Sequence, residues 1–185
     1  ERYFAPLSNQ PAPAPRAPLE LPGGAERHLT LRLPVQMPSL LMGFNVPSLP
    51  TAEQAWEVHA LRLLAAVLDG GYSARLASHL ERGEAIATSA SANYDGHTRG
   101  DGLFLLSGLP NQSRDISLQQ LEQALWQQIE QLQQTPPSTE ELHRVQAQMT
   151  AQLVYAQDSI SHQANQIGML ESIGLPWTLL DEDIA

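Results

Sequence analysis

The chain has 185 residues, 20 acidic and ten basic side chains, a formal net charge of −10 and no cysteine. The basic residues are all arginines and are scattered, which excludes the clustered positive charge of a nucleic-acid surface. Without cysteine there is no disulfide, thiol nucleophile or thiolate metal site. No run approaches the roughly 20 apolar residues of a membrane-spanning helix. We therefore expect a protein without a membrane span, and most simply one domain.

The two ends of the chain differ from its middle. Residues 1–24 contain the proline-rich stretch "APLSNQPAPAPRAPLELPGG", which favours extended, polyproline-like backbone. We predict a linker or strap there and a folded domain over 25–185. The last residues, "GLPWTLLDEDIA", break at Gly174 and Pro176, restart near Leu180 and stop without a helix cap. We accordingly expect the domain to be truncated at its C-terminus.

Four segments have strand patterns. Residues 29–33 alternate leucine with polar residues, as in a half-buried strand, and the apolar run 40–46 suits a more central strand. Residues 83–94 and 101–109 form a strand pair, joined by a polar, glycine-containing turn over 95–100.

Helical patterns fill the intervals. Thr51 and Gln54 have capping-box spacing, and the apolar helix that they predict ends at Asp69-Gly70-Gly71, before a short helix over 73–82. Further boxes at Ser117/Gln120 and Ser138/Glu141 open two long helices, the second with an apolar stripe from Leu142 to Ile160. This order predicts an α+β fold, a largely antiparallel sheet with helices packed on one face.

Catalytic signatures are missing from the sequence. The six histidines, at 28, 59, 79, 97, 143 and 162, are isolated, so no helix carries the His pair of a zinc hydrolase. The acidic run beside His143 lies where a helix begins, and there carboxylates favour the macrodipole. No Gly-x-Ser-x-Gly elbow occurs, and a phosphate loop would need lysine. We predict no catalytic residue and no metal ligand in this chain.

The most distinctive motif is "LLAAVLDGGYSARLASHLERGEAIATSASANY", which follows "GFNVPSL" and precedes "STEELHRVQAQM". In this order the segments resemble the pitrilysin or insulinase-type (M16) zinc peptidases over residues 25–175. The family's Gly-Gly-x-Ser-Ser-Arg-Leu stretch is matched by Gly70, Gly71, Ser73, Arg75 and Leu76, with alanine at position 74. The resemblance implies an M16-like half-domain of the LuxS/metallohydrolase-like type, in which these residues form a structural corner. Ser73 could cap the next helix, and Arg75 could bind a nearby carbonyl or carboxylate.

The same resemblance implies what the chain lacks. The family's zinc motif, His-x-x-Glu-His, is absent, so the similarity is to the non-catalytic half or the inactive partner subunit. That half closes a peptide chamber over zinc held by the other half. Many members grip the peptide with an Arg and a Tyr, but the matching positions here are Glu81 and Thr88, which leaves Arg82 as a candidate substrate-binding residue.

Two functions follow from the resemblance. In the first, the chain forms a wall of the peptide chamber and pairs with a zinc-bearing half, with no cofactor of its own. In the second, it is a purely structural interaction module of the same fold. The absence of lysine and the abundance of Ala, Leu, Arg and Gln suggest a bacterial protein. The absence of cysteine fits either the periplasm or the cytoplasm, and we expect the periplasm slightly more than the cytoplasm.

Overall fold

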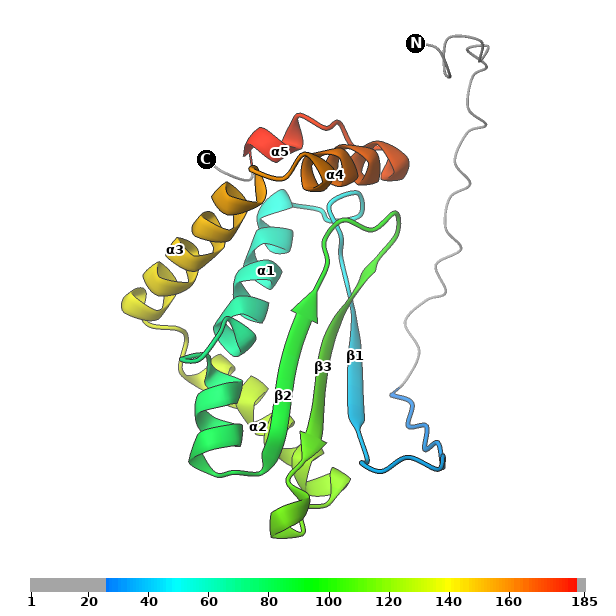
Figure 1. The fold of residues 1–185 in the computed structure, drawn as a ribbon, viewed down its shortest axis with the longest axis vertical. Helices are drawn as coiled ribbons and strands as arrows, with labels where there is room; N and C mark the ends of the chain where they lie inside the picture. The colour runs from blue at the N-terminus through cyan, green and yellow to red at the C-terminus, as the bar shows by residue number, and fades with distance from the viewer. Residues whose placement is uncertain (1–25, 183–185) are drawn as a thin grey trace.

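The computed structural model describes residues 26–182, so the linker or strap predicted over 1–24 lies outside the described residues. Three strands form one antiparallel sheet: β1 (Leu40–Val46), β2 (Ala87–Tyr94) and β3 (Gly102–Pro110), in the order β1-β3-β2. Helices lie to one side of the sheet (Figure 1). The predicted α+β class is confirmed.

The helices follow the predicted order. They are α1 (Ala55–Asp69), the π-helical segment η1 (Ala77–Gly83), α2 (Leu118–Gln134), α3 (Thr139–Ala156), α4 (Ile160–Ile173) and the short α5 (Leu179–Glu182), with a 3₁₀ turn, η2 (Gln112–Arg114), after β3. None of the helices in the described range is both long and apolar enough to span a bilayer.

The core lies between the sheet and the helices α1, η1 and α2. Phe104 and Leu106 of β3 are buried there together with Leu68, Leu80 and Leu121. Along β1, residues 40, 42, 44 and 46 pack against the same cluster, which is the period-2 alternation of a strand with one covered face. Burial of this apolar area is the main favourable term holding the helices on the sheet.

Within residues 26–182, the opposite face of the sheet carries exposed and half-buried side chains. Leu41, Gly43 and Asn45 of β1 lie across from Ser107, Leu105 and Leu103 of β3 in the strand register, and the hydroxyls of Ser91 and Ser107 are hydrogen-bonded to each other at 2.7 Å. Leu41 is 68% exposed and Leu103 50% exposed. Leucines therefore run along the uncovered side of β1 and β3, and we call this surface the open face.

Two strand predictions are corrected. Residues 29–33 are not a strand: they pair with nothing in the described chain, and Leu29, Leu31 and Leu33 are 82%, 70% and 65% exposed. Alternation alone does not form a strand without a neighbour to accept its hydrogen bonds. β1 is an edge strand of the described sheet and not its centre, which β3 occupies.

Two helix predictions also fail. α1 begins at Ala55 without a side-chain cap, because Thr51 instead accepts the backbone N–H of Ser48 in a preceding turn. The stripe from Leu142 to Ile160 belongs to two helices, since the chain turns after Ala156 and Ser159 caps α4 through the N–H of His162. The Ser117/Gln120 box is confirmed.

Candidate functional site

The turn after α1 depends on two glycines for different reasons. A Cβ on Gly70 would lie 2.2 Å from the carbonyl oxygen of Ala66, and Gly71 has φ of +100°, which favours glycine. A backbone hydrogen bond from Ala74 to Gly71 then closes the turn, and Leu76 is fully buried behind it. Ser73 is exposed, and the described residues show no side-chain cap where η1 begins.

Arg75 connects this corner to α3. Its Nε and Nη2 donate to the two carboxylate oxygens of Glu141 at 2.9 and 2.8 Å, a bidentate pair. The hydrogen bond from Arg75 lowers the pKa of Glu141, although partial burial opposes the shift. Ser138 caps α3 through the N–H of Glu141, but the Glu141 carboxylate binds Arg75, so the predicted capping box is only half formed. No local pattern joins Arg75 to Glu141, because 66 positions separate them.

Arg82 turns back toward the corner. Its guanidinium carbon lies 3.7 Å from the centroid of the Tyr72 ring, and its Nη2 donates to the Tyr72 carbonyl at 2.6 Å. Both residues are exposed. The candidate substrate-binding residue is thus held over an aromatic ring of its own chain, a cation–π arrangement.

The outer edge of β2 is occupied by carboxylates. Glu81 accepts the N–H of Ala90 at 2.9 Å, and Asp69 accepts the N–H of Ala92 at 3.2 Å. Burial raises the pKa of Asp69, the hydrogen bond from Ala92 lowers it, and the charge of Glu81 raises it further. Thr88 donates to the carbonyl of Pro110 at 3.4 Å. At the two positions where the resemblance expects an Arg and a Tyr, the side chains therefore bind backbone atoms of this chain.

A groove runs beside the end of β2. It consists of two hollows of about 720 and 610 Å³. Both are lined by Arg62 of α1, Asn93 and Tyr94 of β2, and Met149 and Gln152 of α3, so we treat them as one β2 groove. The smaller hollow reaches Asp69, Gly70 and Gly71, and the larger reaches α4 and α5.

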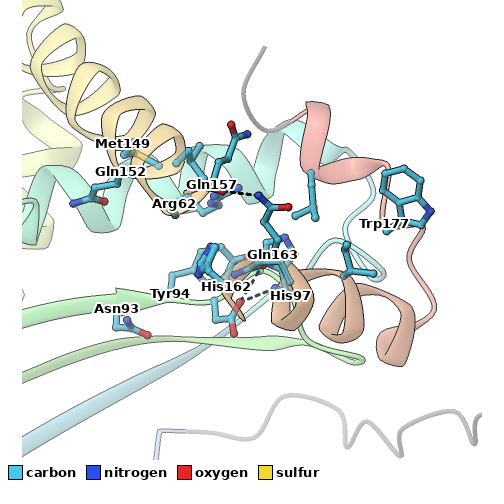
Figure 2. A pocket seen from close by; sticks show the side chains of 17 residues that line it. Arg62, Asn93, Tyr94, His97, Met149, Gln152, Gln157, His162, Gln163 and Trp177 are labelled. Carbon is cyan, nitrogen blue, oxygen red and sulfur yellow. Dashed lines mark hydrogen bonds and ion pairs between the residues drawn. The ribbon is translucent and has the colours of Figure 1, made fainter. Parts of the chain in front are cut away.

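The walls of the β2 groove combine amides with apolar side chains. Gln157, Gln163 and Gln166 line it beside Leu153, Ile167 and Trp177. Figure 2 shows His97 and His162 close to Tyr94, with Trp177 at the far end. The glutamines are plain in the sequence, but nothing there indicates that α1, β2, α3 and α4 meet around one groove.

The histidines are not gathered into a metal centre. Within residues 26–182 no group of three or more His, Asp or Glu side chains is placed to hold a metal ion. His79 instead bonds through Nδ1 to the buried amide oxygen of Gln128 at 2.7 Å, which ties η1 to α2.

Comparisons with known proteins agree with this architecture. The family model described as Peptidase M16 inactive domain matches residues 1–149. A protease from Helicobacter pylori has a similar fold, with TM-score 0.70 and 20% identity, over 81% of this chain and 35% of that one. A candidate zinc protease from Bordetella pertussis Tohama I has TM-score 0.65 and 18% identity, over 79% of this chain and 76% of that one.

The chain thus spans about a third of the length of the Helicobacter protease. No curated protein sequence matches it. Motif order, α+β topology and the family match over residues 1–149 agree with one another, and the chain belongs to the Peptidase M16 inactive domain family.

Proposed function

We propose that this chain is the non-catalytic half, or the inactive partner subunit, of an M16-type zinc peptidase. It pairs with a zinc-bearing half and forms one wall of the peptide chamber. Zinc and the catalytic residues belong to the other half. On this proposal residues 25–185 act as one domain that follows a proline-rich connection, and the corner residues Gly70, Gly71, Ser73, Arg75 and Leu76 are structural.

The observation that carries the proposal is the open face of the sheet. A three-stranded sheet normally buries one face and exposes a polar other face. Here the second face carries Leu41 and Leu103, which are exposed, and Leu105 and Leu109, which are half-buried. Exposed leucines that gather on one face of a sheet are typical of a protein interface. In a family defined by an inactive domain, a catalytic half is the partner that best fits this face.

Adding the chain to its zinc-bearing half tests the proposal. We expect no peptidase activity from the chain alone and at least a tenfold rise in the activity of the zinc half on mixing. Leu41→Asp and Leu103→Asp should each remove most of that rise, because a carboxylate would be buried without a partner. Ile160→Asp is the matched control, since Ile160 is 85% exposed at the start of α4, away from the sheet.

A second candidate, the purely structural module, is favoured by the edge of β2. Glu81 and Thr88 bind backbone atoms, and Arg82 is held by Tyr72. If this candidate is correct, the chain will form a stable complex with a partner that lacks zinc, and mixing will produce no peptidase activity. Zinc content and activity of the purified complex separate the two functions.

A further inference from the structure

The two edges of the sheet differ in how they are protected. At the outer edge of β2, carboxylate side chains accept the N–H groups of Ala90 and Ala92. β1 forms the other margin of the sheet (Figure 1), and within the described chain it pairs with β3 alone. An edge strand without a neighbour is a template for another strand. The outer edge of β1 is therefore the place where this sheet can be extended.

β1 lies in a part of the chain that carries no charge. No Asp, Glu, Arg or His occurs from Leu33 to Ala52, although the whole chain has a net charge of −10. Natural edge strands commonly avoid association through charged side chains, and β1 has none. Two copies of so acidic a chain repel each other over most of their surfaces. An uncharged edge is where two such copies can approach.

The side chains around this edge are apolar on both faces of the sheet. On the covered face, the Trp126 ring packs edge-on against Phe44 with 5.4 Å between the ring centroids, and Trp126 is still 38% exposed. On the open face, Leu41 is exposed. The segment that leads into β1 adds a row of alternating, exposed apolar side chains, at Leu29, Leu31, Leu33, Val35 and Met37.

We infer that a second copy of this chain adds its own β1 antiparallel to the outer edge of β1, with the two-fold axis at Gly43. All seven residues of the strand then pair, and Met42 lies opposite Phe44 of the second copy. On the open face Leu41 lies opposite Asn45 of the second copy. The two three-stranded sheets become one, in the order β2-β3-β1-β1-β3-β2, with the helices of both copies on the same side. This homodimer goes beyond the proposed function, which concerns a different partner.

The edge of β1 is complementary to itself. A two-fold interface uses the same surface on both copies, and this surface has no charge to repel its copy. Gly43 at the axis has no side chain, so the two backbones can approach closely. A pair of seven-residue strands alone falls short of a standard interface of about 1,600 Å². Residues 29–37 supply the remainder, because in an antiparallel pair the segment before β1 of one copy lies beyond Val46 of the other.

The first test is sedimentation velocity of the full chain. We expect a concentration-dependent species of twice the 20.2 kDa of one chain, with a Kd of about 1–100 μM. A chain that stays monomeric at about 100 μM overturns the inference. A chain that is monomeric alone but uses β1 to bind the zinc half overturns it as well.

The second test places a single cysteine at the axis. The chain contains no cysteine, so Gly43→Cys can form only an intermolecular disulfide. Residues directly opposite in an antiparallel pair have Cα atoms about 4.5–5.5 Å apart, which is within disulfide range. We expect Gly43→Cys to cross-link at least tenfold faster than Leu103→Cys, a control that is also exposed on the open face but lies on the central strand. Equal rates overturn the pairing.

The third test exchanges charges across the axis. Gly43→Lys and Gly43→Glu each place like charges directly opposite one another and should each weaken the dimer at least tenfold. An equimolar mixture should form a heterodimer with a Kd within about threefold of the parent value. An added Cβ at Gly43 contacts the Leu105 side chain at 3.4 Å, a van der Waals distance, so both variants should fold, which circular dichroism checks. Failure of the mixture to pair overturns the axis at Gly43.

The two proposals fail separately. A monomeric chain that activates the zinc half overturns only the homodimer. A chain that forms the homodimer but does not activate the zinc half overturns only the proposed pairing with that half.

Discussion

Leucines on the two faces of the sheet differ in how far they are buried. On the covered face Leu106 is 1% exposed among the side chains of the core cluster, whereas Leu103, three residues earlier on the same strand, is 50% exposed on the open face. The first leucine contributes to folding in this chain, and the second contributes little to it. The fold therefore buries one face of its sheet, and the leucines of the other face remain exposed to a partner.

Truncation of one leucine on each face should have very unequal effects on stability. Leu106→Ala leaves a cavity in the packed core and should lower the free energy of unfolding by about 2–5 kcal/mol. Leu103→Ala should change it by less than about 0.5 kcal/mol. Urea unfolding followed by circular dichroism measures both. Similar losses from the two variants would show that the open face is not free in the isolated chain.

Local sequence patterns predict only part of this fold. The α+β class, the glycine corner and the Ser117 cap follow from local patterns, because each depends on residues within one turn or one strand. The Thr51 cap fails because its hydroxyl accepts the N–H of Ser48, a competing local bond that the capping pattern does not reveal. The predicted strand over 29–33 fails because a strand requires a neighbour, which periodicity does not supply.

The candidate site was predictable only in part. The motif from Gly70 to Leu76 marked the corner, but the contact of Arg75 with Glu141 joins residues 66 positions apart. The β2 groove requires the packing of α3 against α1 and the turn between α3 and α4, both of which are tertiary. Glu81 looked like a lost substrate contact in the sequence, whereas its part in closing the β2 edge appears only once the strand order is known.

The covered face of the sheet depends on the corner that brings η1 under the sheet. Gly70→Ala places a Cβ 2.2 Å from the Ala66 carbonyl oxygen and should destabilise the chain by about 1–3 kcal/mol. Gly168→Ala is a helical control, because no atom lies within 4 Å of the added Cβ. That control should be neutral or stabilising by up to about 1 kcal/mol. Thermal melts of both variants measure the difference, and equal changes in Tm would mean that the corner accommodates the added Cβ without a loss of stability.

The smallest expected effect concerns the ion pair that holds α3 to the corner. Arg75 and Glu141 have side chains only 14% and 17% exposed, so Glu141→Gln should cost about 1–2 kcal/mol at neutral pH through loss of a charge-assisted bidentate contact. The pKa of Glu141 lies below its usual value of 4.5. Folding therefore gains stability from this group above pH 4.5 and loses it as the pH falls through the lowered pKa.

The cost of Glu141→Gln should accordingly shrink toward zero in acid, where the parent carboxylate is protonated as well.

For Asp69→Asn, the effect on stability should change with pH in the opposite direction. Because the pKa of Asp69 is raised, ionisation of this group opposes folding above its usual value of 3.8. Asp69→Asn should lower the free energy of unfolding by less than about 0.5 kcal/mol at neutral pH. The stability of this variant relative to the parent chain should then decrease as the pH falls. Urea midpoints between pH 3 and pH 7 measure both trends, and parallel pH profiles for the two variants would contradict the assignment of opposite shifts to the carboxylates at the corner and at the edge of β2.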